Sequence, residues 1–173
     1  MLLDWRKELA RDGSRITLSG LHMAMHCHHY NINLQKMLED TMGPEGIRLI
    51  VQSAEEATFQ GWYSILEQFQ QIRTIKSKLE LMASLYQNCG MGIVHFQRMT
   101  HRGGRIIGLS SHHVTGWLAK HGRRDTPGCH FTRGWIAGVM EVVYGRALGD
   151  YQVEETACKI TGHTQCEFMA REK

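Results

Sequence analysis

Apolar residues recur at helical spacing through the first half of the chain. Residues 45–69 carry the clearest stripe, with an apolar side chain at every third or fourth position, which predicts a long amphipathic helix. The same period predicts a helix over 71–87 and an earlier one over 19–41, which Ser19 would cap and a Gly-Pro pair would end. Before them, residues 14–18 alternate in a way that predicts a short strand or an extended lead-in.

The pattern changes in the second half, where short apolar runs are separated by turns that contain glycine. The predicted elements are strands at 92–99 and 105–109, a helix at 129–144, and strands at 151–160 and 165–170. A Gly-Gly pair between the first two strands predicts a hairpin, and the second strand is expected to extend into 110–118. Helices followed by a ββαββ order predict an α+β fold, in which N-terminal helices pack on an antiparallel sheet.

The composition fits one globular domain over residues 1–173, with a helical part at about 19–88 and a sheet part at about 91–171. The chain is 42% hydrophobic and long enough to bury a core. Its 20 basic and 17 acidic residues give a net charge of +3, which is too mild to indicate nucleic acid as a partner. The sequence shows no apolar run that would span a membrane and no secretory signal, which predicts a cytoplasmic protein.

Five cysteines in a reducing compartment are not expected to form a disulfide framework. Cys158 and Cys166 each lie four positions from Gly162, so a hairpin centred there would make them cross-strand neighbours, with Cβ atoms about 4.5–5.5 Å apart. That geometry suits two thiolates on one metal and would also suit a disulfide. Cys129 opens the preceding helix, where the helix N-terminus favours a thiolate.

A carboxylate lies just upstream of Cys158, at Glu154 or Glu155. Three sulfurs and one carboxylate would complete a tetrahedral zinc site. Glu155 is three positions before Cys158 and would face the other side of a regular strand, so a bulge or a late strand start is needed. The alternative is that the cysteines are small buried thiols of a sheet.

The segment from Cys129 to Phe168 combines Cys129-His-Phe-Thr-Arg-Gly-Trp-Ile-Ala-Gly, Tyr144-Gly-Arg and a tail of the form E-x2-C-x3-G-x3-C-x-F. This combination resembles the 4-vinyl-reductase-like domain family. The resemblance implies a cytoplasmic α+β domain that binds small molecules or hydrocarbons and is commonly dimeric. Relatives include bacteriochlorophyll-biosynthesis proteins and the sensor domains of aromatic-responsive transcription activators.

The resemblance also implies a metal. In those sensor domains three cysteines and one glutamate hold a zinc ion, and their positions fall on Cys129, Glu155, Cys158 and Cys166. The stretch that precedes Glu155 is longer here than in the sensors. The implied role of the zinc is structural, because four protein ligands leave no open position for a substrate.

Histidines form a second candidate site. His22, His26 and His29 fall at i, i+4 and i+7, on one face of the predicted helix over 19–41, and two histidines four apart on a helix are a common metal-binding pair. Residues that could complete such a site are Glu55, Glu56 and His95. An open position there would suit iron, another transition metal or a haem. The alternatives are a solvated helix face or pocket lining without metal.

Other candidates for pocket lining are aromatic or imidazole side chains, namely Tyr30, Trp62, His95 and Trp135. His112 and His113 fall in the expected extension of the second strand, where neighbours face opposite sides, so one of them would face a pocket and the other solvent.

Three functions follow from these features. The favoured one is a domain that binds an apolar, aromatic or tetrapyrrole-type ligand, with a structural zinc on the C-terminal hairpin, acting as a homodimer. The alternative is a metal- or haem-dependent enzyme that uses the cluster of His22, His26 and His29, so the sequence leaves catalysis open. The third is an assembly subunit, since vesicle-tethering proteins resemble the same broad fold.

Overall fold

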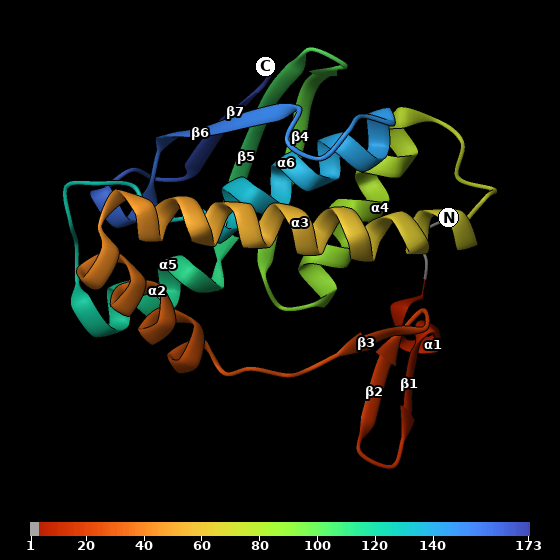
Figure 1. The fold of residues 1–173 in the computed structure, drawn as a ribbon, viewed down its shortest axis with the longest axis horizontal. Coiled ribbons are helices and arrows are strands. Elements are labelled where there is room, and N and C mark those ends of the chain that lie inside the picture. Colours follow the sequence, from red (N-terminus) through yellow and green to blue (C-terminus); the bar gives the residue numbers. More distant parts are fainter. Residues whose placement is uncertain (1–3) are drawn as a thin grey trace.

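The computed structural model describes residues 4–173, and Figure 1 shows their arrangement. The helices are α1 (Trp5–Glu8), α2 (His28–Met42), α3 (Pro44–Gln68), α4 (Ile75–Asn88), α5 (His112–His121) and α6 (His130–Tyr144), with the 3-10 turn η1 (Lys159–Thr161). The strands are β1 (Leu9–Asp12), β2 (Arg15–Leu18), β3 (Leu21–Met23), β4 (Gly92–Thr100), β5 (Gly103–Ser111), β6 (Tyr151–Ala157) and β7 (Cys166–Glu172). The predicted α+β fold is confirmed, with an antiparallel sheet in the C-terminal half.

The main sheet has the order β4-β5-β7-β6, and every neighbouring pair is antiparallel. Helices α4 and α6 pack on the sheet, and α3 lies along α6 as an outer layer (Figure 1). Helix α6 is therefore covered on almost every side, which is why it carries apolar and small residues around most of its circumference.

Two glycines of α6 set the distance between α6 and α3. A Cβ atom at Gly134 would lie 2.0 Å from the carbonyl oxygen of Val51, and one at Gly138 would lie 2.6 Å from that of Glu55. The backbones of the two helices therefore meet at a separation that only glycine permits at these positions. This contact fixes the start of α6, where the cysteine cluster begins.

Several predicted elements are confirmed with shifted boundaries. The long helix over 45–69 is α3, the helix over 129–144 is α6, and the last hairpin is β6–β7. The helix predicted over 71–87 begins later, at Ile75, because the Thr74 side chain accepts a hydrogen bond from the backbone N–H of Ser77 and caps it there.

The helix predicted over 19–41 is wrong in its first third. Ser19 and Gly20 have φ of 47° and 78° and form a turn, after which β3 pairs with β2. The Ser19 side chain is not a cap of α2, since its hydroxyl donates to Glu8. Strands β1, β2 and β3 form a small sheet beside the end of α3, and a coil leads from it to α2, which begins only at His28 (Figure 1).

The predicted extension of the second strand into 110–118 is also wrong. Strand β5 ends at Ser111, and the chain turns at once into α5. Gly116 of α5 lies against Ile32 of α2, where a Cβ atom would come within 2.7 Å of the isoleucine side chain. Buried positions in α5 follow helical spacing, at His113, Val114, Gly116 and Trp117.

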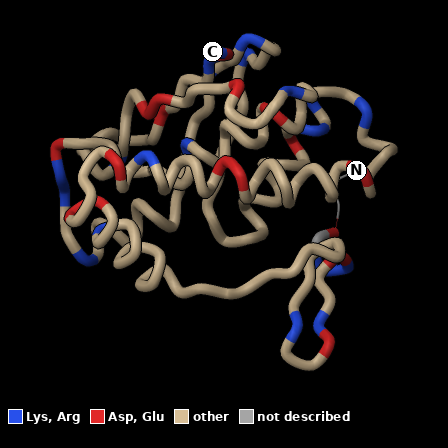
Figure 2. The backbone as a smooth tube through the Cα atoms, in the orientation of Figure 1, with Lys and Arg blue, Asp and Glu red and all other residues tan. Residues whose placement is uncertain are grey.

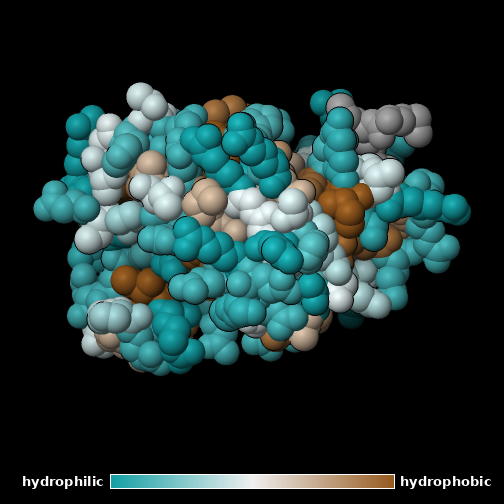
Figure 3. Space-filling view, turned by 90° about the horizontal axis from the view of Figure 1, so that it is seen from above, coloured by the Kyte–Doolittle hydropathy of each residue, from teal (hydrophilic) through white to brown (hydrophobic). Residues whose placement is uncertain are grey.

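Charges are spread over the described surface. Figure 2 shows acidic and basic residues interspersed along the chain rather than gathered on one face. The face in Figure 3 is mostly hydrophilic, with small apolar patches between the polar side chains. Among residues 4–173, no helix is both long and apolar enough to span a bilayer.

Candidate metal centre

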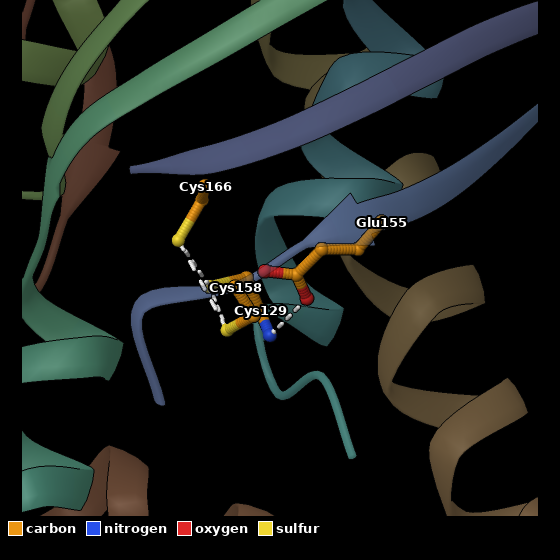
Figure 4. A group of neighbouring side chains, drawn as sticks. All are labelled: Cys129, Glu155, Cys158 and Cys166. Atoms are coloured by element: carbon orange, nitrogen blue, oxygen red, sulfur yellow. Dashed lines mark hydrogen bonds between the residues drawn. The ribbon is translucent and has the colours of Figure 1, made fainter. Parts of the chain in front are cut away.

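Four buried side chains from separate parts of the C-terminal half converge on one point (Figure 4). Cys129 directly precedes α6, Glu155 lies on β6, Cys158 lies between β6 and η1, and Cys166 is the first residue of β7. The site thus joins the start of α6 to both strands of the last hairpin.

The spacing of the sulfur atoms fits one tetrahedral ion. The Sγ atom of Cys129 lies 3.7 Å from that of Cys166 and 4.0 Å from that of Cys158, and the remaining Sγ–Sγ distance is also 4.0 Å. A zinc ion with bonds of about 2.3 Å to tetrahedral thiolates places the sulfurs about 3.8 Å apart. One ligand atom from each of the four residues lies within 4.8 Å of the others. The cluster could therefore hold a metal ion.

Glu155 reaches the cluster because β6 contains a bulge. Glu155 pairs with Phe168 and Ala157 with Glu167, so Thr156 is an extra residue in the strand. The extra residue reverses the alternation and brings Glu155 to the side of Cys158, as the predicted metal site requires.

The two carboxylate oxygens of Glu155 have different surroundings. Oε2 accepts a hydrogen bond of 2.8 Å from the backbone N–H of Cys129. Oε1 is buried and has no hydrogen-bond partner among the described residues. Burial and the neighbouring Cys158 raise the pKa of Glu155 to about 8. A metal ion would supply the positive charge that this oxygen otherwise lacks.

The thiols are coupled in the same way. Hydrogen bonds from Cys129 and Cys166 lower the pKa of Cys158, and the same contact with Cys158 raises the pKa of Cys129. Without a cation, one thiolate forms at the expense of the others. A divalent cation favours deprotonation of all three. The interpretation as ordinary buried thiols of a sheet explains their burial but not the unpaired oxygen of Glu155.

The structure does not support the histidine site. His22 lies on β3, His26 lies in the coil before α2, and His29 lies in α2, so they do not share a helix face. All three are exposed. The prediction failed because it rested on a helix that begins later than expected. Within residues 4–173, Cys129, Glu155, Cys158 and Cys166 are the group of three or more ligand-type side chains close enough to share an ion.

The four predicted pocket residues have different fates. Tyr30 is exposed on α2, and Trp62 is half-buried against the core. Trp135 is a core residue whose ring lies 4.3 Å from that of Tyr86. His95 lines a surface groove of about 540 Å³ between α4 and β4.

Sequence reasoning missed a polar network beneath α2. The carboxylate of Glu39 is paired with Arg124 and His130, and it accepts a hydrogen bond from Gln35. Burial would raise the pKa of Glu39, but these hydrogen bonds outweigh it and lower the pKa to about 2. The Gln35 amide also donates to the carbonyl of Gly128. The network ties α2 to the loop that leads into Cys129.

Comparison with known proteins agrees with this site. Residues 117–172 match the 4-vinyl-reductase domain family, and this range contains the whole cysteine and glutamate cluster. Curated proteins give no significant match.

Two solved structures show the same fold. The phenol-responsive sensory domain of the transcription activator PoxR, crystallised with phenol, matches with a TM-score of 0.84 and 17% identity, over 98% of this chain and 87% of that domain. A vinyl-4-reductase family protein from Methanocaldococcus jannaschii matches with a TM-score of 0.52 and 13% identity, over 87% of this chain and 98% of that protein. By sequence and by fold, the C-terminal part of the chain belongs to the 4-vinyl-reductase domain family.

Proposed function

We propose that this chain is a small-molecule-binding domain whose C-terminal hairpin is fixed by a structural zinc ion. The observation that carries the proposal is the likeness of 98% of the chain to the PoxR sensory domain, which was crystallised with phenol. We expect an apolar or aromatic ligand. A homodimer in the cytoplasm, which the family resemblance implies, stays a prediction.

Zinc is the metal that the donor set favours. Three thiolates and one carboxylate are soft and borderline ligands that zinc accepts in tetrahedral geometry. The ligands are Cys129, Glu155, Cys158 and Cys166, and all four are buried. With four protein ligands, no coordination position is left for a substrate. The proposed role of the ion is to hold the hairpin against the start of α6.

The test is the metal content of protein purified without a histidine tag, followed by a ligand screen. Mass spectrometry of the metals should give about one zinc per chain, and Cys158→Ser should lose it. Cys27→Ser is the matched control, because Cys27 is exposed and far from the cluster in sequence. A metal-free but stable protein would contradict the zinc site.

The ligand screen uses the change in melting temperature with a panel of neutral aromatic compounds. Binding to the folded state raises the melting temperature as the ligand concentration rises above Kd. We expect at least one member of the panel to raise it in a concentration-dependent way. If no compound does so, the assembly-subunit hypothesis becomes the better one. The histidine-based enzyme is not proposed, since its three histidines do not converge.

A further inference from the structure

His113 is a buried histidine whose ring has no partner. It lies in the first turn of α5 and is 5% exposed. Neither ring nitrogen has a hydrogen-bond partner among residues 4–173. Buried polar groups are almost always paired, and leaving one unpaired is destabilising. An unpaired imidazole in the interior therefore indicates that something else completes it.

The ring lines a small cavity of about 110 Å³. The cavity lies between α2, α3, α5 and the start of α6. Its other walls are Asn31, Leu34, Gln35, Ile50, Met91 and Phe131. The Phe131 ring is stacked on His113 at 5.2 Å between centroids. The described lining is mostly apolar and contains no charged side chain.

A second unpaired group lines the same cavity. Gln35 is 3% exposed, and its Nε2 atom donates to the Glu39 carboxylate and to the carbonyl of Gly128. Both partners are acceptors, so the orientation of the amide is fixed by chemistry. The Oε1 atom of Gln35 is left as a buried acceptor without a partner among the described residues.

The charge state of His113 decides what it offers. Burial lowers the pKa of His113 well below its ordinary value of 6.5, and the neighbouring His112 and His130 lower it further. The ring is therefore neutral and presents one N–H donor and one acceptor nitrogen. Together with Gln35, the cavity offers both a donor and acceptors but no charge.

We propose that this cavity is the ligand site and that it takes a small neutral molecule with one hydroxyl group, which donates to Gln35 and accepts the N–H of His113. This inference rests on the proposed small-molecule binding and gives it a location and a ligand class. A cavity of about 150 Å³ holds benzene, so about 110 Å³ suits one ring or a short chain after a slight adjustment of its walls. A tetrapyrrole is far too large for it.

The binding test compares phenol with toluene, which has a methyl group in place of the hydroxyl. Isothermal titration should show that phenol binds the wild-type protein more tightly than toluene does. His113→Phe keeps an aromatic ring but removes the nitrogens, and we expect it to weaken phenol binding about tenfold, with toluene unchanged or tighter. His101→Phe is the matched control, since the His101 side chain is exposed in the β4–β5 turn and should leave both affinities unchanged.

Two further measurements keep the test independent of how His113→Phe folds. Ile50→Phe fills the cavity from the opposite wall and should abolish phenol binding. In wild-type protein labelled at methionine methyl groups, phenol ring protons should show contacts with Met91, which lines the cavity.

The outcomes separate the two proposals. Phenol that binds equally well to His113→Phe and Ile50→Phe would overturn this site while leaving small-molecule binding intact. A cavity that holds only ordered water, with no Met91 contact at saturating phenol, would also overturn it. If neither phenol nor any compound of the wider panel binds, small-molecule binding itself fails.

Discussion

At the scale of single residues, the metal site depends on one extra position in a strand. Thr156 is the bulge residue, and without it Glu155 would face away from the cysteines. The free Oε1 atom of Glu155 then becomes the fourth candidate ligand. Glu154, the other candidate from the sequence, is exposed on the opposite side of β6.

Glu155→Gln should weaken zinc binding by about tenfold or more, because a neutral amide is a poorer ligand than a carboxylate. The measurement is competition with a chromophoric chelator. Glu154→Gln is the matched control on the same strand and should bind zinc like the wild type. Equal losses in both variants would show that a general loss of acidic charge, rather than coordination by Glu155, weakens binding.

A second single-residue prediction concerns pH and Glu39. Its folded pKa of about 2 lies below the ordinary 4.5, so its ionised form stabilises the fold above pH 4.5, and this contribution is lost as pH falls from about 4.5 to 2. Denaturant unfolding should therefore show wild type and Glu39→Gln becoming closer in stability by about 1 kcal/mol between pH 7 and pH 4. A difference that stays constant with pH would contradict this. Comparing the two proteins cancels acid effects at other sites.

At the scale of elements, the pair α3 and α6 is the rigid support of the cluster. Gly134 and Gly138 permit the close contact of their backbones, and α6 begins one residue after Cys129. A shift of α6 away from α3 would also move the first thiol of the metal site.

Gly134→Ala should destabilise the protein by about 1–3 kcal/mol, because its Cβ atom would collide with the backbone of α3 and force the helices apart. Gly61→Ala is the matched control on α3. Its Cβ atom would meet only the Leu21 side chain at 3.2 Å, and that side chain can move. Urea unfolding measures both variants. Equal stability of the two would mean that the α3–α6 contact is looser than described.

At the scale of the whole molecule, the cluster connects segments that are far apart in the chain. It joins the loop before α6 to β6 and β7, and the network around Glu39 joins the same loop to α2. The metal site and the cavity at His113 are thus linked through the start of α6, where Cys129 and Phe131 lie two residues apart.

Removal of zinc should therefore lower the stability of the whole domain rather than of the hairpin alone. Chelation should lower the melting temperature by about 10 °C or more, which corresponds to a few kcal/mol for a chain of this size. Calorimetry with and without chelator measures it, and added zinc should restore the original value. A chelated protein that melts at the same temperature would show that the cluster carries no structural ion.

Local patterns determined much of this protein. Helical periodicity was enough for α3 and α6, because each buries a stripe that recurs at helical spacing. The spacing around Gly162 placed Cys158 and Cys166 together, because a hairpin converts symmetric positions into neighbours. The cysteine and glutamate set was accessible from the family resemblance.

The tertiary structure alone decided the remainder. Residues 19–27 and 112–118 form a turn with a strand and a helix because of what they pack against, β2 in one case and α2 in the other. The predicted histidine cluster is absent for the same reason. His113 was misplaced on a strand, and its significance depends on missing partners in a cavity that four separate helices enclose. A local sequence fixes periodicity, but only packing between distant segments decides which polar groups are buried and what they lack.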